Sequence, residues 1–133
     1  MIDAENEIFN TVADSLRLKF KDISIYGEGV QVPSNFPCVT LVEADNAVLE
    51  RTQDSGNFEN HAQLMYEVNV YSNKTQGKKA ECKKILREAD AVLQSLGFIR
   101  LSTTPVEMSS PTIYRLAIRY SAIISKELKT YRR

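Results

Sequence analysis

The sequence predicts an α+β domain in which two helices pack on one face of a mainly antiparallel sheet. Two segments, 62–71 and 112–124, alternate apolar and polar residues, which is the pattern of a strand with one covered face. A third segment, 78–96, repeats apolar residues at steps of three and four, as does a helix with one buried stripe. The length of 133 residues fits one domain over 1–133.

The N-terminal element is predicted to be a helix over 4–20. Ile8, Val12 and Leu16 stand four residues apart and make one apolar stripe, and Asp3 is the candidate N-cap. The neighbouring apolar positions that widen this stripe are Phe9, Ala13 and Phe20.

The next segments change to short β-rich runs. Gly27 and Gly29 interrupt "ISIYGEGVQVP", which predicts a hairpin or a bent strand, and "CVTLVEAD" (38–45) predicts a continuous apolar strand. Residues 46–60 predict a long exposed connection, although "NAVLER" also fits a helical turn or an extension of the strand.

The C-terminal half supplies the rest of the sheet and the second helix. Gly97 is predicted to close the 78–96 helix in a left-handed conformation, with Phe98 folding back against the helix. The segment "FIRLSTTP" starts a further strand. The positions expected to face the core are Ala62, Leu64, Tyr66, Val68, Val70, Tyr114, Leu116, Ile118, Tyr120, Ala122 and Ile124 in the strands, and Cys82, Ile85, Leu86, Ala89, Val92, Leu93 and Leu96 in the helix.

The charges are divided unevenly along the chain although the formal net charge is zero. Residues 1–60 contain 11 acidic and 4 basic residues, a balance of −7, and residues 61–133 contain 6 acidic and 13 basic residues, a balance of +7. Two interpretations stay open. The fold can interleave the halves so that the difference disappears, or acidic and basic surfaces of neighbouring copies can meet.

No motif for catalysis, a cofactor or a metal is found. The Gly77–Lys78 pair lacks the glycine five positions earlier and the Ser or Thr that a phosphate-binding loop requires, and "GEG" lacks the third glycine of a dinucleotide fingerprint. His61 is the single histidine, so a transition-metal site is not expected. Two cysteines, Cys38 and Cys82, lie in apolar patterns and are expected to be free buried thiols. We expect a protein that is not an enzyme.

One basic cluster is prominent: Lys74, Lys78, Lys79, Lys83, Lys84 and Arg87. It is either a solvated helix face or a surface that contacts phosphates without reading sequence. A small nucleic-acid-binding module that uses the 78–96 helix therefore remains an alternative function.

The run "YEVNVYSNKTQGKKAECKKILREADAVLQSLGFIR" (66–100) resembles the central region of tail terminator proteins of long-tailed phages, also called tail completion, head–tail joining or minor capsid proteins. The features are a strand ending in "VYSN", a "GKK" helix start, an acid near "EAD", and an "LGF" stop followed by Arg100. "TIYRLAIRYSAII" is similar to the final strand of that family. The resemblance covers residues 60–125 well and the N-terminal helix loosely.

The resemblance implies a structural virion protein without a cofactor. Family members form a homo-oligomeric ring, usually a hexamer, on the head-proximal end of the tail tube, where they end tube polymerisation. The implied partners are the tail tube protein, a neck or stopper protein, and DNA that passes through the channel without sequence-specific binding. The implied location is the tail or neck of the virion, assembled in the host cytoplasm, with no membrane. A stopper or adaptor of the neck is the alternative within this class.

Two groups of candidate contact residues follow. The long 46–60 connection can reach a neighbouring copy or the tube, or its apolar residues can pack on their own domain. The candidates for the oligomer or tube interface are Leu49, Arg51, Asn57, Phe58 and Glu59, and those for the channel or a subunit contact are Glu67, Lys79, Lys83, Arg115 and Arg119.

Overall fold

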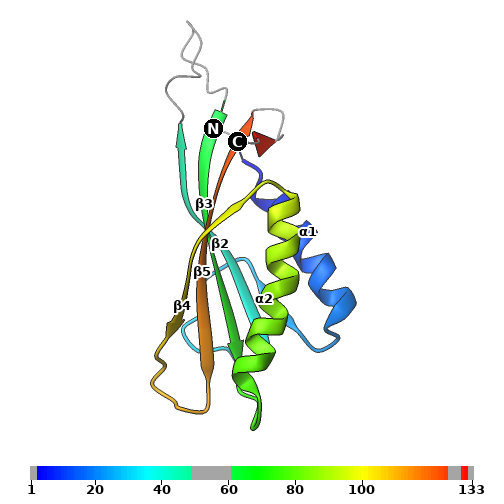
Figure 1. Ribbon diagram of the computed structural model, residues 1–133, viewed down its shortest axis with the longest axis vertical. Coiled ribbons are helices and arrows are strands. Elements are labelled where there is room, and N and C mark those ends of the chain that lie inside the picture. Colours follow the sequence, from blue (N-terminus) through cyan, green and yellow to red (C-terminus); the bar gives the residue numbers. More distant parts are fainter. Residues whose placement is uncertain (1–2, 49–60, 126–129, 132–133) are drawn as a thin grey trace, which may run out of the picture.

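The computed structural model describes residues 3–48, 61–125 and 130–131, and the statements below concern these ranges. Both helices lie on the same face of one sheet (Figure 1), so the predicted α+β architecture is confirmed. In chain order the elements are α1 (Glu5–Lys19), β1 (Ser24–Tyr26), β2 (Cys38–Val48), β3 (His61–Ser72), α2 (Lys78–Ser95), β4 (Ile99–Val106), β5 (Tyr114–Ser125) and β6 (Thr130–Tyr131).

The sheet has the strand order β1-β2-β3-β5-β4, and β6 pairs with β5. All pairs are antiparallel except β1–β2, which is parallel. The predicted hairpin or bent strand around Gly27 and Gly29 is therefore wrong. Instead, the chain from 27 to 37 carries β1 back to the start of β2, so the two strands run in the same direction. The predicted 38–45 strand extends to Val48, which selects strand extension for 46–48.

The α1 stripe is buried as predicted, with Val12 and Leu16 fully excluded from solvent and Ile8 nearly so. The N-cap position belongs to Ala4, one residue later than the predicted Asp3. Ala4 is itself buried in the core, while the Asp3 carboxylate accepts a hydrogen bond from the Glu5 N–H at 3.1 Å. The acid therefore still satisfies one of the free N–H groups of the first turn.

The apolar stripe of α2 packs on the centre of the sheet. The C-terminal end of the helix has the predicted geometry. Gly97 has φ 92, its N–H donates to the Gln94 carbonyl at 2.9 Å, and the Phe98 N–H donates to the Leu93 carbonyl at 2.9 Å. These two bonds form a Schellman motif. Phe98 is buried and meets the Tyr66 ring edge-on at a centroid distance of 5.4 Å. The start of β4 is thus fixed by the end of α2.

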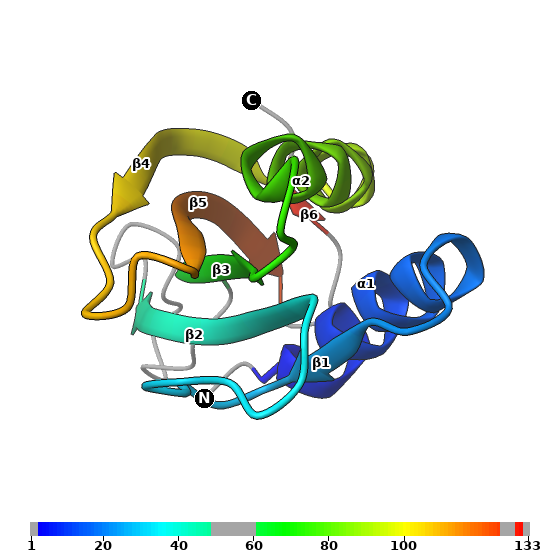
Figure 2. The ribbon, with the colours of Figure 1, turned by 90° about the horizontal axis from the view of Figure 1, so that it is seen from below.

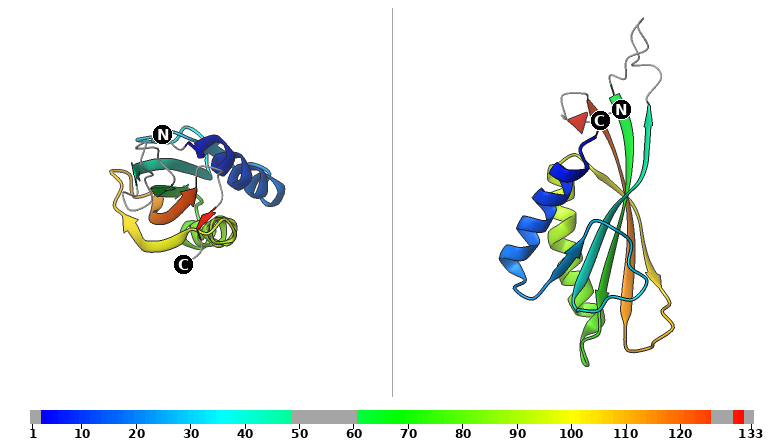
Figure 3. Two further views of the ribbon diagram at one scale, coloured as in Figure 1. Left: turned by 90° about the horizontal axis from the view of Figure 1, so that it is seen from above. Right: turned by 180° about the vertical axis from the view of Figure 1, so that it is seen from behind.

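The two helices divide the sheet between them. Seen along the strands, α1 lies beside β1 and β2 while α2 lies beside β5 and β4 (Figure 2; Figure 3). The Lys19 Nζ on α1 pairs with Glu88 Oε1 on α2 at 2.8 Å, which joins the helices across the face that they share.

The helix-free face of the sheet is less exposed than the alternation of apolar and polar residues along the strands predicted. Gln63 and Arg119 are exposed, but Asn69 and Tyr71 are buried. The chain between β1 and β2 covers this end of the sheet, since the Tyr71 hydroxyl donates to the Val30 carbonyl at 3.1 Å. Strand periodicity identifies the two faces but cannot show which loops return over them.

Both cysteines are free and buried, as expected. Burial raises the pKa of Cys38 to about 11 and that of Cys82 to about 12, so both remain protonated thiols at neutral pH.

We expect Gly97→Ala to destabilise the fold by about 1–2 kcal/mol, because an alanine at φ 92 places its Cβ against the following carbonyl. Gly29→Ala is the matched control, since Gly29 lies outside the positive-φ region and has nothing within 4 Å of an added Cβ. Urea unfolding of both variants measures the difference. Equal stabilities would show that the left-handed helix end is not a constraint.

Candidate functional site

A polar network joins β3 and β5 on the helix-free face. Glu67 and Arg119 stand directly opposite each other, and Arg119 Nη2 lies 3.2 Å from Glu67 Oε2. Arg115 Nε donates to Asn69 Oδ1 at 2.9 Å, and its guanidinium lies over the Tyr71 ring at 5.4 Å. Three of the predicted channel or contact residues, Glu67, Arg115 and Arg119, are therefore brought together. Glu67 balances the charge of Arg119, while Arg115 is held by a neutral amide and an aromatic ring and keeps its positive charge. The half-exposed ion pair adds little to stability.

Lys79 and Lys83 are placed elsewhere. Both are exposed on α2, which packs on the opposite face of the sheet. The five predicted residues therefore belong to two separate surfaces, because the basic helix and the basic positions of β5 flank the sheet from opposite sides.

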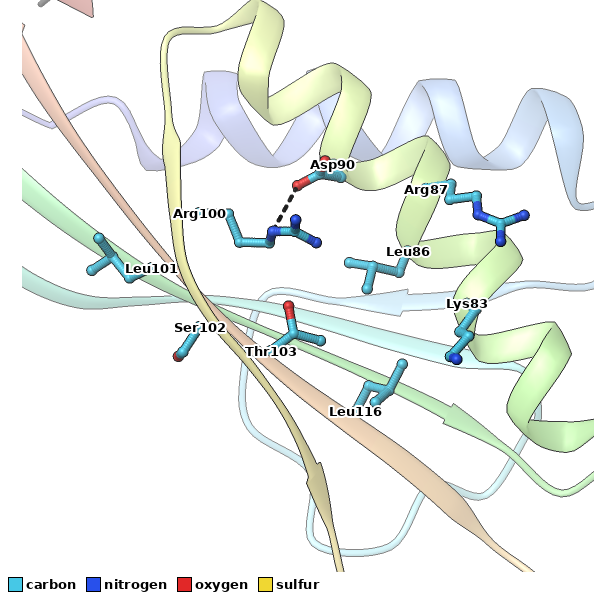
Figure 4. Close-up of a pocket in the computed structure, with 9 residues that line it drawn as sticks. All are labelled: Lys83, Leu86, Arg87, Asp90, Arg100, Leu101, Ser102, Thr103 and Leu116. Atoms are coloured by element: carbon cyan, nitrogen blue, oxygen red, sulfur yellow. Dashed lines mark ion pairs between the residues drawn. The ribbon is translucent and has the colours of Figure 1, made fainter.

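Between α2 and β4 runs a groove of about 580 Å³, which we call the basic groove (Figure 4). Arg100 projects from β4 towards α2, and its Nε lies 3.9 Å from Asp90 Oδ1. Lys83 and Arg87 supply positive charge from α2, so three cations outnumber one carboxylate. The full lining is Lys83, Leu86, Arg87, Asp90, Arg100, Leu101, Ser102, Thr103 and Leu116.

Asp90 is held in the wall of the basic groove by a buried tyrosine. The Tyr120 hydroxyl donates to Asp90 Oδ1 at 2.6 Å. Burial, and then the bond and charge of Asp90, raise the pKa of Tyr120 well above its ordinary value, so the phenol stays a hydrogen-bond donor. Asp90 is the second of the two acids in "EAD" (88–90), and its contacts make it a structural link between α2, β5 and β4.

An acidic pocket of about 530 Å³ lies on the same face of the sheet but near its other edge, between α1, β1 and β2. Its lining is Glu5, Asn6, Phe9, Tyr26, Gly27, Glu28, Leu41 and Tyr66. Glu43 adjoins it, because the Tyr66 hydroxyl at its wall lies 3.5 Å from Glu43 Oε1. Burial raises the pKa of Glu43, and the carboxylates of Glu5 and Asp3 raise it further.

The strand registers place the two charged surfaces at one level of the sheet. Glu43 is opposite Tyr66, Tyr66 is opposite Tyr120, and Tyr120 is opposite Arg100. This row crosses the helix-covered face from β2 to β4. An acid therefore stands at one end of the row and a base at the other, each held beside a buried tyrosine.

The predicted interface residues of the 46–60 connection, namely Leu49, Arg51, Asn57, Phe58 and Glu59, lie outside the described residues. Sequence reasoning, for its part, did not select Glu43 or Asp90 as site residues and used Arg100 only as part of a motif. The available signal was a carboxylate within the apolar run "CVTLVEAD" and an arginine directly after the helix stop.

The described part of the chain contains no group of three or more His, Cys, Asp or Glu side chains placed to hold a metal ion. Neither described helix is long and apolar enough to cross a membrane. No protein-family model and no curated protein matches the sequence.

We expect Tyr120→Phe to lower the free energy of unfolding by about 1.5–3 kcal/mol, because it removes a hydrogen bond to a charged group that is largely buried. Tyr114→Phe is the control, since the Tyr114 hydroxyl has no partner among the residues that the structure describes. Chemical denaturation compares the two variants. If Tyr120→Phe lowers the free energy of unfolding no more than Tyr114→Phe does, the role assigned to Asp90 is contradicted.

We expect Glu43→Gln to stabilise the isolated chain at pH 7 and to lose this advantage in acid. The folded-state pKa of Glu43 is raised, so ionised Glu43 opposes folding at neutral pH, and this penalty disappears as pH falls through the raised pKa to the ordinary value of 4.5. Thermal unfolding at pH 7 and pH 4, in dilute solution, measures the difference between the two proteins. An advantage that persists unchanged at pH 4 would contradict the raised pKa.

Proposed function

We propose that this chain is a structural protein of a phage tail or phage-tail-like particle. In this proposal, copies of the chain form a ring at the head-proximal end of the tail tube. The ring ends tube polymerisation and joins the tail to the neck. The observation that carries the proposal is the separation of acidic and basic halves across one sheet.

The strand order keeps the two halves of the sequence apart. β1 and β2 come from the acidic half and occupy one side of the sheet, beside α1 (Figure 2). β3, β5 and β4 come from the basic half and occupy the other side, with α2. The interleaved arrangement that would cancel the −7 and +7 balances is therefore not favoured by this topology.

A body with unlike charged sides suits assembly into a ring. Head-to-tail contacts use two different surfaces of the same chain, and such contacts close into rings when the rotation between copies allows it. Complementary potentials also guide the copies into register and oppose wrong pairings. This supports a self-assembling protein over a module whose function ends with one bound ligand.

The helix-free face suits contact with passing DNA. Its arginines are already engaged, Arg119 by Glu67 and Arg115 by Asn69. Tight binding of DNA requires cations that neutralise phosphates and release counterions. Here one of the two arginines is neutralised by an ion pair and the other is held in place by a hydrogen bond, so this surface would let DNA slide past without holding it tightly.

The deciding experiment removes the gene for this chain from the particle-producing genome and images the particles in negative stain. Tails of uncontrolled length are expected if the ring ends polymerisation. Tails of normal length without heads would leave only a joining role, as for a stopper or adaptor. Intact particles with normal tails would overturn the proposal.

The basic α2 surface favours one second candidate, a nucleic-acid-binding module. Lys79, Lys83 and Lys84 are all exposed. If phosphate contact is the function, changing the three residues to glutamate abolishes a DNA binding that weakens steeply as salt rises. Under the proposed tail function, a double variant with Lys79→Glu and Lys84→Glu, which leaves the basic groove unchanged, restores normal tails to the gene-deleted particles.

A further inference from the structure

We propose that neighbouring copies join edge to edge, with β4 of one copy beside the outer edge of β2 of the next and Arg100 paired with the neighbour's Glu43. The inference rests on the proposed ring and names the surfaces that would form it. It commits to a second copy of this chain as the partner.

The first edge is β4, whose outer side pairs with no strand in the described ranges of the chain. All its residues from Ile99 to Pro105 are exposed, and the apolar side chains of Ile99 and Leu101 are 43% and 54% exposed. From Leu101 to Thr104 the strand has no charged residue. Natural edge strands are normally protected by charges or by proline. Here Pro105 blocks only the far end, so the upstream part remains available for pairing.

The second edge is the later part of β2. β1 pairs with β2 only from Cys38 to Thr40. Beyond that point no described strand pairs with the outer edge of β2, and the bulge at Ala44 lies within this stretch. Since β2 and β5 run in one direction and β4 runs opposite to β5, a β4 strand placed beside the neighbouring β2 would be antiparallel to it.

The charges of the two edges are opposite in sign, and they lie at the same level and on the same face of the sheet. Arg100 and Glu43 end the same cross-strand row, so edge-to-edge copies at equal height would bring them together. Both residues lie on the helix-covered face, where the basic groove opens beside β4 and the acidic pocket beside β2. Joining the edges would therefore also bring Lys83 and Arg87 towards Glu5 and Glu28.

Arg100 and Glu43 can each take part in a further ion pair with a neighbouring copy. The Arg100 side chain is 46% exposed and its ion pair within the chain is long, at 3.9 Å. Glu43 stands among other carboxylates, and its two hydrogen-bond partners, the Tyr66 hydroxyl at 3.5 Å and the Asn46 side chain, are both uncharged. A guanidinium from the next copy would supply a positive charge, which no described residue of the same chain gives to this acidic cluster.

Covalent trapping tests which edges meet. The variant carrying Ala44→Cys and Leu101→Cys together is treated with a short bismaleimide, while the native thiols stay buried and protonated. β2 and β4 of one chain are separated by two strands, roughly 14 Å at the usual strand spacing, which is too far for the reagent to span. A ladder of multimers is expected, and each single-cysteine variant should give none. Dimers from a single-cysteine variant would indicate like edges meeting and would overturn the inference.

Charge exchange then tests the residue pair. In the two-cysteine chain, Glu43→Arg alone or Arg100→Glu alone should lower the ladder yield about tenfold, because like charges face each other. An equimolar mixture of the two variants should restore the yield, since every contact can again join opposite charges. Lys79→Glu and Glu7→Arg make the same changes in net charge outside both edges and should have no effect. Circular dichroism confirms that each variant is folded.

The outcomes separate this inference from the proposed function. The edge pairing is overturned if no ladder forms, either in solution or on tail tubes. It is also overturned if the mixture of variants fails to restore the ladder. In both cases the gene-deletion result still decides the function. A ladder from a chain whose deletion leaves tails normal would keep the pairing and remove the tail role. If the basic groove instead holds an acidic peptide of another protein, Arg100→Glu prevents that capture but Glu43→Arg does not.

Discussion

The burial of α2 against the centre of the sheet is the constraint on which the rest of the structure depends. Its stripe places Ile85, Leu86 and Leu93 against β3 and β5, and each large apolar side chain removed from water contributes about 1.5–3 kcal/mol before conformational entropy is subtracted. The Schellman motif then reverses the chain at Gly97 and fixes where β4 begins. The position of Arg100 at the mouth of the basic groove is therefore a consequence of core packing and not of a separate site.

Two buried tyrosines connect this core to both charged surfaces. Tyr66 and Tyr120 stand opposite each other on β3 and β5. The Tyr66 hydroxyl is directed towards Glu43 on β2, and the Tyr120 hydroxyl towards Asp90 on α2. A tyrosine buries a large apolar ring while its hydroxyl still needs a partner, so its placement also fixes that partner. In this way the packing of the sheet centre determines the orientation of Glu43 and Asp90, and through Asp90 that of Arg100.

Local pattern predicted the elements well, because helix periodicity, strand alternation and the glycine at the end of α2 are short-range signals. It failed where contacts between distant segments decide the outcome. The parallel pairing of β1 with β2 and the loop over Tyr71 depend on where the chain returns, which no nearby residue encodes. The row from Glu43 to Arg100 was missed for the same reason, since its members come from four strands whose order becomes visible only in the folded sheet. Of the five predicted channel or contact residues, Glu67, Arg115 and Arg119 lie together on β3 and β5, because alternation assigns them to one face. Lys79 and Lys83 lie apart from them on α2.

The proposed pairing also explains how a single chain can avoid wrong contacts. If two β4 edges met, Arg100 and the cations of the basic groove would face their own copies, and two β2 edges would oppose Glu43 and its neighbouring carboxylates. Both symmetric contacts are repulsive, whereas the head-to-tail contact is attractive, so charge alone selects the arrangement that can close into a ring. The raised pKa of Glu43 fits the same logic. An ionised acid that weakens the isolated chain becomes favourable once a neighbour supplies its counter-charge, so part of the free energy withheld from folding is recovered on assembly.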